Sequence, residues 1–330
     1  MREALERSWY DPNGAWSLLK PLAWVFGGVV ALRRGGYRRG WLASERVDVP
    51  VLVVGNITVG GSGKTPLTLA LIDKLRARGL RVGVVSRGYG GKSDRYPLDV
   101  DADTPAALAG DEPAMIARQS GALVVVDPRR PRGARRLVAQ GADIVIADDG
   151  LQHYALARDA EIAVTDARRG LGNARLLPAG PLREAPARLD TVDLSLVHGQ
   201  GADFWLAPGA AYPVAGAGAT RELTAFKGAP VHAIAGIGDP RRFFDMLRGQ
   251  GLEVIEHPMP DHHRYEPADL DFADDYPVLM TCKDAVKCGA FDNAGRCWQV
   301  PVRVSFSQAC EARIEALLDR LTERVHMHRG

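Results

Sequence analysis

Residues 55–66 read GNITVGGSGKTP and follow the apolar run VLVV at 51–54. Residues 67–78 come next and carry apolar side chains at helical spacing. A buried strand, a glycine-rich turn, a Lys-Thr pair and a helix are typical of a phosphate-binding loop, where backbone N–H groups surround phosphate oxygens. In such a loop Lys64 neutralises the β and γ phosphates, and the hydroxyl of Thr65 ligates Mg²⁺. The stretch therefore predicts a nucleoside triphosphate ligand.

The loop departs from the usual GxxxxGK[ST] spacing at one position, because Thr58 stands where the first glycine would fall. The glycines that follow supply the flexible backbone instead. A bare glycine-rich turn is the alternative, but strand, loop, Lys-Thr pair and helix all agree with nucleotide binding. We expect the nucleotide contacts to come from Thr58, Gly60, Gly61, Ser62, Gly63, Lys64 and Thr65.

Strands and helices alternate on the carboxyl side of the loop. The patterns indicate strands at 81–86, 123–126 and 144–147, and a helix that begins near Pro113. This alternation predicts an α/β fold of the P-loop NTPase type, with a mostly parallel sheet, helices on both faces and ligands at the carboxyl ends of the strands.

A second, smaller α/β lobe is expected after residues 199–228, which are rich in Gly, Ala and Pro. Strand, helix and strand repeat from 231 to 255, and a strand at 300–306 and a helix at 308–325 close the chain. We expect an N-terminal membrane-interfacial segment at 1–46, a P-loop kinase core at 47–228, and the smaller lobe at 229–330.

The composition excludes several classes of protein. The chain has 330 residues, 46% of them hydrophobic, and 42 basic against 40 acidic residues give a net charge of +2. There is enough apolar material for a large core and no overall basic charge for nucleic acid. Four cysteines lack CxxC spacing, so free thiols in a reducing compartment are expected rather than disulfides.

Residues 21–32, PLAWVFGGVVAL, are apolar and uncharged, and arginines follow at 33, 34, 38 and 39. Twelve residues are too few for a spanning helix, which needs about 20. Basic and aromatic flanks, including Trp9, Trp24, Tyr37 and Trp41, favour a helix that lies in the membrane interface. A helix packed on the protein's own core is the alternative.

Two acidic pairs lie at the ends of predicted elements. Asp148 and Asp149 end an apolar strand, as a carboxylate does that holds Mg²⁺ beside a phosphate loop. Asp-Asp-Gly is also ordinary turn chemistry. Asp111 and Glu112 precede a helix and, on their own, suit a helix cap. His262 lies in PDHHRY at 260–265, a cluster that by itself is most often a surface loop.

Eight ordered motifs resemble the tetraacyldisaccharide 4'-kinase family, which phosphorylates the 4'-hydroxyl of the lipid A disaccharide precursor to give lipid IVA. They begin at residues 55, 86, 110, 148, 176, 235, 260 and 281 and read GNITVGGSGKTP, SRGYGG, GDEP, DDGLQH, LLPAGPLRE, AGIGDPRRFF, PDHHRY and TCKDAVKC. In the last motif the family usually has an acid where Cys282 stands. The resemblance covers nearly the whole chain, whereas a generic P-loop protein would share only the first motif.

The resemblance implies site residues at the matching positions. Lys64 would hold the phosphates, and Asp111 paired with His262 would deprotonate the sugar hydroxyl. The implied Mg²⁺ set is Thr65, Asp148, Asp149, Glu112 and Gln152. The implied phosphate or substrate cations are Arg87, Arg183 and one of Arg129 and Arg130, here taken as Arg130.

The resemblance also implies the ligands and the location. ATP and Mg²⁺ are the expected cofactors, the lipid A disaccharide precursor is the substrate, and an anionic membrane surface is the partner. We expect no nucleic acid, no obligate protein partner, and a peripheral or monotopic place on the cytoplasmic face of the bacterial inner membrane. A soluble kinase for a small polar acceptor, a nucleotide-switch ATPase and a glycan-binding scaffold are the rivals.

Overall fold

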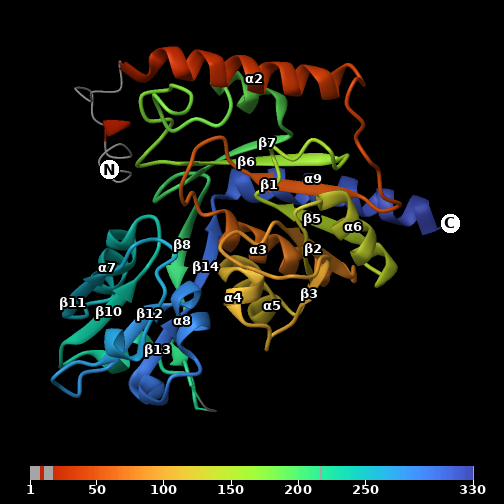
Figure 1. Ribbon diagram of the computed structural model, residues 1–330. Coiled ribbons are helices and arrows are strands. Elements are labelled where there is room, and N and C mark those ends of the chain that lie inside the picture. Colours follow the sequence, from red (N-terminus) through yellow and green to blue (C-terminus); the bar gives the residue numbers. More distant parts are fainter. Residues whose placement is uncertain (1–7, 11–17, 216–217, 330) are drawn as a thin grey trace. The chain divides into compact units, whose positions relative to one another are not determined.

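The computed structural model describes residues 8–10, 18–215 and 218–329 (Figure 1). The chain forms two compact units. The first comprises the described residues of 1–87, 127–205 and 306–330, and the second comprises 88–126 and the described residues of 206–305. Each unit has its own buried core.

The first unit contains a parallel sheet in which β1 lies between β5 and β6, with β2 beside β5 and β7 beside β6. Every residue of β1 is buried, which explains why its sequence is a continuous apolar run rather than an alternating one. The register pairs Val54 with Asp148, so the start of the phosphate loop lies beside the acidic end of β5. The strands are β1 (Val51–Gly55), β2 (Val82–Ser86), β5 (Ile144–Asp148), β6 (Ala160–Asp166) and β7 (Leu194–His198), with β8 (Phe204–Pro208) starting here.

Helices labelled in Figure 1 accompany the strands of the first unit. They are α2 (Lys20–Arg38), α3 (Lys64–Ala77), α6 (Arg130–Ala139) and α9 (Gln308–Arg329), with the short helix η2 (Pro186–Thr191). The helices α3 and α6 pack on the sheet. Lys74 of α3 pairs with Glu311 and Glu315 of α9 at 2.8 and 2.7 Å, so the last helix of the chain is fastened to the helix that follows the loop.

The second unit contains a five-stranded sheet of order β11-β10-β12-β13-β9, parallel except for β9. Phe243, Phe244 and Leu247 of α7 fill one core cluster, and Ala285 and Cys288 of α8 belong to another. The helix α5 packs against α8. The strands of this sheet are β9 (Tyr212–Pro213), β10 (Val231–Ala235), β11 (Val254–Pro258), β12 (Val278–Thr281) and β13 (Cys297–Val300). The unit also includes β3 (Leu98–Val100), β4 (Leu123–Val126) and most of β14 (Val302–Phe306), which are not part of this sheet. The helices are α4 (Ala106–Ala109), α5 (Asp111–Ser120), α7 (Pro240–Gly249) and α8 (Cys282–Cys288), with the short helices η3 (Leu223–Phe226), η4 (Pro267–Leu270) and η5 (Asp292–Arg296).

These units differ from the contiguous domains 47–228 and 229–330 that the sequence suggested. Residues 88–126, with Asp111, belong to the second unit, and the closing helix α9 belongs to the first. The physical reason is that packing partners are set by contacts distant in sequence, such as the ion pairs between α3 and α9. The four cysteines are buried and free, as expected.

Candidate active site

The phosphate loop joins β1 to α3 within the first unit. Gly60 and Gly63 have φ values of 96° and 87°, in the left-handed region where glycine is free of strain. A Cβ on Gly63 would lie 2.6 Å from Nδ1 of His198, so this glycine also allows a close packing contact. The hydroxyl of Ser62 is buried and has no hydrogen-bond partner among the described residues. Such an orphaned hydroxyl beside the first turn of a helix suits a phosphate oxygen.

Lys64, the first residue of α3, faces an ionic cluster. Its Nζ lies 3.6 Å from Oδ1 of Asp149, and Arg183 donates two hydrogen bonds to the same carboxylate, at 3.0 and 2.9 Å. Burial acts to raise the pKa of Asp149, but the charges of Lys64 and Arg183 outweigh it and lower that pKa. Asp149 is thus an ionised carboxylate, and its φ of 47° is one of the few positive values at a non-glycine residue.

Asp148 lies deeper than Asp149. It is buried at the end of β5, and its Oδ1 accepts a hydrogen bond from the Thr68 hydroxyl at 3.2 Å. Arg130 is also buried, and it donates to the carbonyl oxygens of Val85 and, at 2.7 Å, Asp148. Burial lowers the pKa of Arg130 to about 10. The guanidinium of Arg130 therefore ties together the ends of β2 and β5, while Arg87 and Arg129 are exposed.

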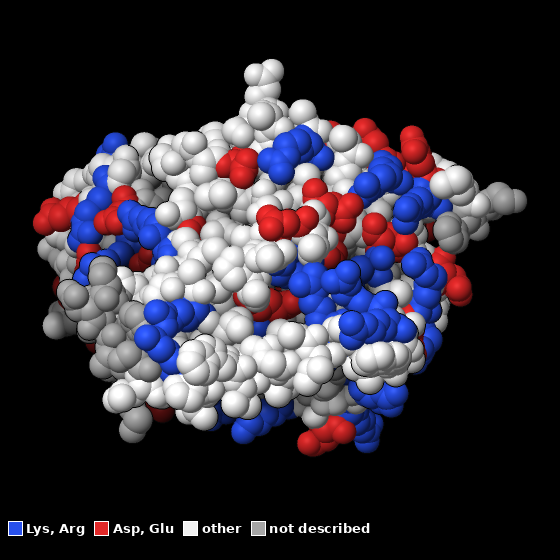
Figure 2. Space-filling model, turned by 90° about the horizontal axis from the view of Figure 1, so that it is seen from above, with Lys and Arg blue, Asp and Glu red and all other residues white. Residues whose placement is uncertain are grey.

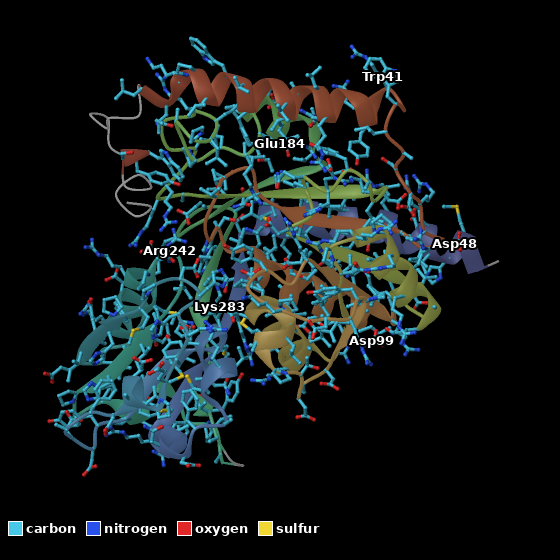
Figure 3. All side chains as sticks on the ribbon, viewed as in Figure 1. Trp41, Asp48, Asp99, Glu184, Arg242 and Lys283 are labelled. Carbon is cyan, nitrogen blue, oxygen red and sulfur yellow. The ribbon has the colours of Figure 1, made fainter. Side chains whose placement is uncertain are left out.

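A buried polar network supports this cluster from the side of residues 150–191. Gln152 donates to the carbonyl of Asn56 at 3.2 Å and to Glu184 at 2.8 Å, and Arg183 donates to the same carbonyl at 2.9 Å. Glu184, labelled in Figure 3, also accepts from the hydroxyl of Tyr154. Oε1 of Gln152 is buried without a hydrogen-bond partner among the described residues. The network thus orients one free amide oxygen of Gln152.

The oxygen donors of the first unit fit Mg²⁺ shared with a nucleotide. Thr65 offers a hydroxyl, and Asp148 and Asp149 offer carboxylates, which are the hard ligands that Mg²⁺ prefers. In the described part of the chain, no three His, Cys, Asp and Glu side chains gather as a metal cage. Mg²⁺ normally takes one or two carboxylates, substrate phosphates and water, so this sparse set fits Mg²⁺ shared with a nucleotide.

The second unit holds the predicted acid–base pair. Nδ1 of His262 lies 3.0 Å from Oδ2 of Asp111, although the two residues are 151 positions apart in the chain. His262 has a φ of 62°, and the ring of Tyr89 meets its ring edge-on with centroids 5.0 Å apart. Burial acts to raise the pKa of Asp111, but hydrogen bonds from His262 and Lys287 outweigh it and lower that pKa. Asp111 is therefore held ionised beside an imidazole.

Asp111 and Glu112 are the first two residues of α5, so the helix begins two residues before Pro113, and Gly110 rather than an acid stands at its N-cap. The negative charge of Glu112 attracts the ammonium of Lys283 of α8, which is labelled in Figure 3. Burial acts to lower the pKa of Lys283, but Glu112 and Asp261 outweigh it and raise that pKa. Asp111, Glu112 and His262 lie in the second unit, and Lys64, Thr65, Asp148, Asp149, Gln152 and Arg183 lie in the first.

The comparisons with known proteins decide the family. The profile of the family described as Tetraacyldisaccharide-1-P 4'-kinase matches residues 15–319. The chain belongs to this family. A tetraacyldisaccharide 4'-kinase of Alkalilimnicola ehrlichii is 51% identical over 92% of each chain, and one of Pseudomonas aeruginosa is 48% identical over 98% of this chain and 99% of its own. The solved LpxK of Aquifex aeolicus in complex with ATP is 27% identical and superposes with a TM-score of 0.78, covering 94% of this chain and 99% of its own.

In this member of the family, one face of α2 exposes apolar side chains to solvent. Leu22, Val25, Val29 and Leu32 form one exposed stripe along the helix, and Trp24 beside it is 75% exposed. Lys and Arg side chains (blue) gather beside a white, uncharged band in the view from above in Figure 2. Across the described residues, no helix is long and apolar enough to cross a bilayer.

The opposite face of α2 packs on the first unit, as the alternative of a helix packed on the protein's own core predicts, and membrane contact of the exposed stripe stays a prediction. Ala23 is buried there, and a Cβ on Gly27 would lie 2.7 Å from Leu176. Trp9 differs from the expectation of an exposed interfacial ring, because it is buried and donates to the carbonyl of Pro178 at 3.0 Å. Much of the rest of the predicted segment 1–46 before residue 18 lies outside the described residues.

Two residues that contact the candidate site residues were not predicted from the sequence. Asn56 is fully buried, and its carbonyl receives both Gln152 and Arg183. Asn56 stands within the loop motif directly after the apolar strand. A polar residue that close to a buried strand indicates a side chain that needs hydrogen-bond partners. Lys287 contacts Asp111, and its spacing of four from Lys283 indicated a shared helix face.

Proposed function

We propose that the protein transfers the γ-phosphoryl group of ATP to the 4'-hydroxyl of a tetraacyldisaccharide 1-phosphate, forming lipid IVA. The observation that carries this proposal is the phosphate loop that ends in Lys64, beside the ionised Asp149, in a member of the 4'-kinase family. Named relatives at about half identity over most of the chain support the same reaction.

In this reaction the first unit binds and polarises the nucleotide. The left-handed backbone at Gly60 and Gly63 opens the loop around the phosphates, and Lys64 stabilises the charge that spreads over the transferred group. Arg183 supports Lys64 indirectly by holding Asp149 at 2.9 and 3.0 Å. Phosphoryl transfer asks the protein mainly for such positioning and charge stabilisation.

Mg²⁺ would be held by the Thr65 hydroxyl with Asp148 and Asp149, and Gln152 would orient its water. When bound, the ion neutralises phosphate charge and fixes the phosphate oxygens. Glu112 is proposed as a further supporting acid, and Arg87 as a cation for phosphate. Because the guanidinium of Arg130 donates hydrogen bonds to two carbonyl oxygens, we propose that its contribution is to hold the end of β5 in place.

Asp111 and His262 are proposed to accept the proton of the acceptor. As the hydroxyl oxygen bonds to the γ phosphorus, the bond from that phosphorus to the β–γ bridging oxygen breaks, and ADP leaves with its electron pair. The hydroxyl proton passes to Asp111. The imidazole keeps the carboxylate ionised and oriented beforehand, since it occupies Oδ2 at 3.0 Å.

The acceptor carries acyl chains, which gives the exposed stripe of α2 a use. We propose that this face lies in the membrane interface and that the flanking arginines meet anionic headgroups. The protein would then act as a peripheral or monotopic enzyme on the cytoplasmic face of the bacterial inner membrane. No nucleic acid and no obligate protein partner enter this proposal.

A direct assay tests the proposal. Purified protein, γ-labelled ATP, Mg²⁺ and the tetraacyldisaccharide 1-phosphate should give labelled lipid on thin-layer separation. Lys64→Ala should lower turnover by about 10²- to 10³-fold, because a lost stabilising contact to transition-state charge costs that much. Lys74→Ala on the same helix removes two ion pairs away from the loop and should leave turnover within about twofold of wild type. Wild-type protein that labels no lipid refutes the proposal.

A further inference from the structure

The motif TCKDAVKC at residues 281–288 contains Lys287, which contacts Asp111. It forms the end of β12 and the whole of α8. Asp284 is fully buried there and accepts hydrogen bonds from the Thr281 hydroxyl at 2.6 Å and from the backbone N–H of Gly236 at 2.9 Å. Gly236 is required for this contact, since a Cβ there would lie 2.8 Å from the carboxylate. The start of α8 is therefore fixed in place.

Lys287 stands one turn further along α8. Its Nζ lies 2.9 Å from Oδ2 of Asp111 and 3.9 Å from Oδ1 of Asp284, and it donates to the carbonyl of His263 at 3.2 Å. The ammonium also sits 5.5 Å from the ring centre of Tyr265. The side chain of Lys287 is only 10% exposed, so its charge is held by two carboxylates and a carbonyl rather than by water.

The contacts of Lys287 and His262 converge on one atom. Nδ1 of His262 is 3.0 Å and Nζ of Lys287 is 2.9 Å from the same Oδ2 of Asp111. Two donors on one oxygen hold a carboxylate against rotation and direct its other oxygen elsewhere. We propose that Lys287 is a positioning residue for phosphoryl transfer: with His262 it occupies Oδ2 of Asp111, so that Oδ1 is the atom that takes the proton of the acceptor hydroxyl.

This inference rests on the proposed function and adds an atomic assignment to it. The hydroxyl proton moves to Oδ1 while Lys287 keeps its own three protons, so the lysine is neither acid nor base. Of the other charged or titratable groups nearby, Lys283 of α8 acts on Asp111 itself, because its charge helps to lower the pKa of that carboxyl. The rest act on its partners: Asp284 faces Lys287, Asp261 and Tyr89 face His262, and Glu112 acts on Lys283.

A purely structural role for Lys287, as a fastener between α5 and α8, makes different predictions. Arg118 of α5 serves as the matched control, because it donates to the carbonyl of Val286 of α8 at 3.2 Å and does not touch Asp111. If fastening were all that Lys287 does, Arg118→Met and Lys287→Met would lower activity and stability in parallel.

The experiment measures kcat and KM for ATP and for the lipid acceptor. Lys287→Met should lower kcat about 10- to 100-fold, the usual result of a misplaced reacting group, and leave the KM for ATP within about twofold. Lys287→Arg keeps a charged donor and should recover most of the lost turnover. Arg118→Met should keep kcat. Lys287→Gln, whose side chain ends one atom short of the ammonium, should lose as much as Lys287→Met and serves if the latter does not fold.

A double mutant separates positioning from general damage. In an Asp111→Asn background, Lys287→Met should add little further loss, since residues that act as one unit are not additive. Full turnover in both Lys287→Met and Lys287→Gln would overturn the inference, as would an undiminished loss in the double mutant. If wild-type protein labels no lipid, the proposed function fails instead, so the two failures are distinct.

Discussion

Single atoms explain why particular residues occupy the phosphate loop. Gly63 combines a left-handed backbone with a neighbour, His198, that leaves no room for a side chain. Gly61 has neither constraint, since a Cβ there meets nothing within 4 Å. Two glycines in one motif therefore have different physical reasons.

Gly63→Ala should lower the free energy of unfolding by about 1–3 kcal/mol and weaken ATP binding, because strain and a steric clash act together. Gly61→Ala is the matched control and should leave thermal unfolding unchanged. Differential scanning calorimetry with and without ATP checks both. Equal melting temperatures for the two variants would contradict the strain argument.

The ionisation of Asp111 gives a pH dependence with a definite sign. Its pKa is lowered in the folded protein, so the unfolded state binds more protons and the carboxylate stabilises the fold above its ordinary pKa of about 4. That stabilisation is lost as the pH falls through the lowered pKa. We expect the free energy of unfolding to fall less steeply below about pH 4 in Asp111→Asn than in wild type. Urea titrations across acidic pH measure both slopes, and identical slopes would exclude this contribution.

At the scale of elements, α2 is the helix whose two faces have separate tasks. One face is packed on the first unit, and the other exposes the stripe of Leu22, Val25, Val29 and Leu32. Moving this exposed apolar stripe from water into a membrane interface would lower the free energy, because its side chains would be removed from water.

Val25→Glu combined with Leu32→Glu should weaken binding to anionic phospholipid vesicles by about tenfold or more, since each apolar side chain contributes about 1.5–3 kcal/mol when fully buried. The affinity of the double variant for ATP, measured without turnover, should equal that of wild type. Met327→Glu on α9 is the control, because Met327 is 71% exposed on another helix. Vesicle sedimentation is the measurement, and unchanged sedimentation of the double variant would exclude α2 as the contact.

At the scale of the whole molecule, the chain passes between its two units more than once. The first unit takes its last helix from the end of the chain, and the second unit takes α5 from the middle of the kinase core that the sequence suggested. Asp111 and His262 meet only because of this exchange.

A fragment of residues 47–228 should therefore not fold, although the sequence makes it resemble a complete domain. It lacks α9, whose Ile314, Leu318 and Leu321 are fully buried, and it leaves Asp111 without Lys287. Circular dichroism and ATP binding of the fragment and the full chain provide the comparison. Cooperative unfolding of the fragment with ATP affinity near that of the full chain would contradict the exchange between units.

Much of this protein could be predicted from the sequence, because short-range patterns encode it. The buried strand before the loop, the Lys-Thr pair and the acidic end of β5 are local signals, and all three occupy the positions that the α/β pattern indicated. Ordered motifs likewise sufficed to identify the family.

Only the tertiary structure decided which distant residues share an atom or a core. No local pattern relates Lys287 to Oδ2 of Asp111, buries Trp9 against Pro178, or fastens α9 to α3. The reason is physical: backbone propensity and periodicity act over a few residues, whereas these contacts depend on how whole elements pack, and packing is settled by the sum of burial and charge over the folded chain.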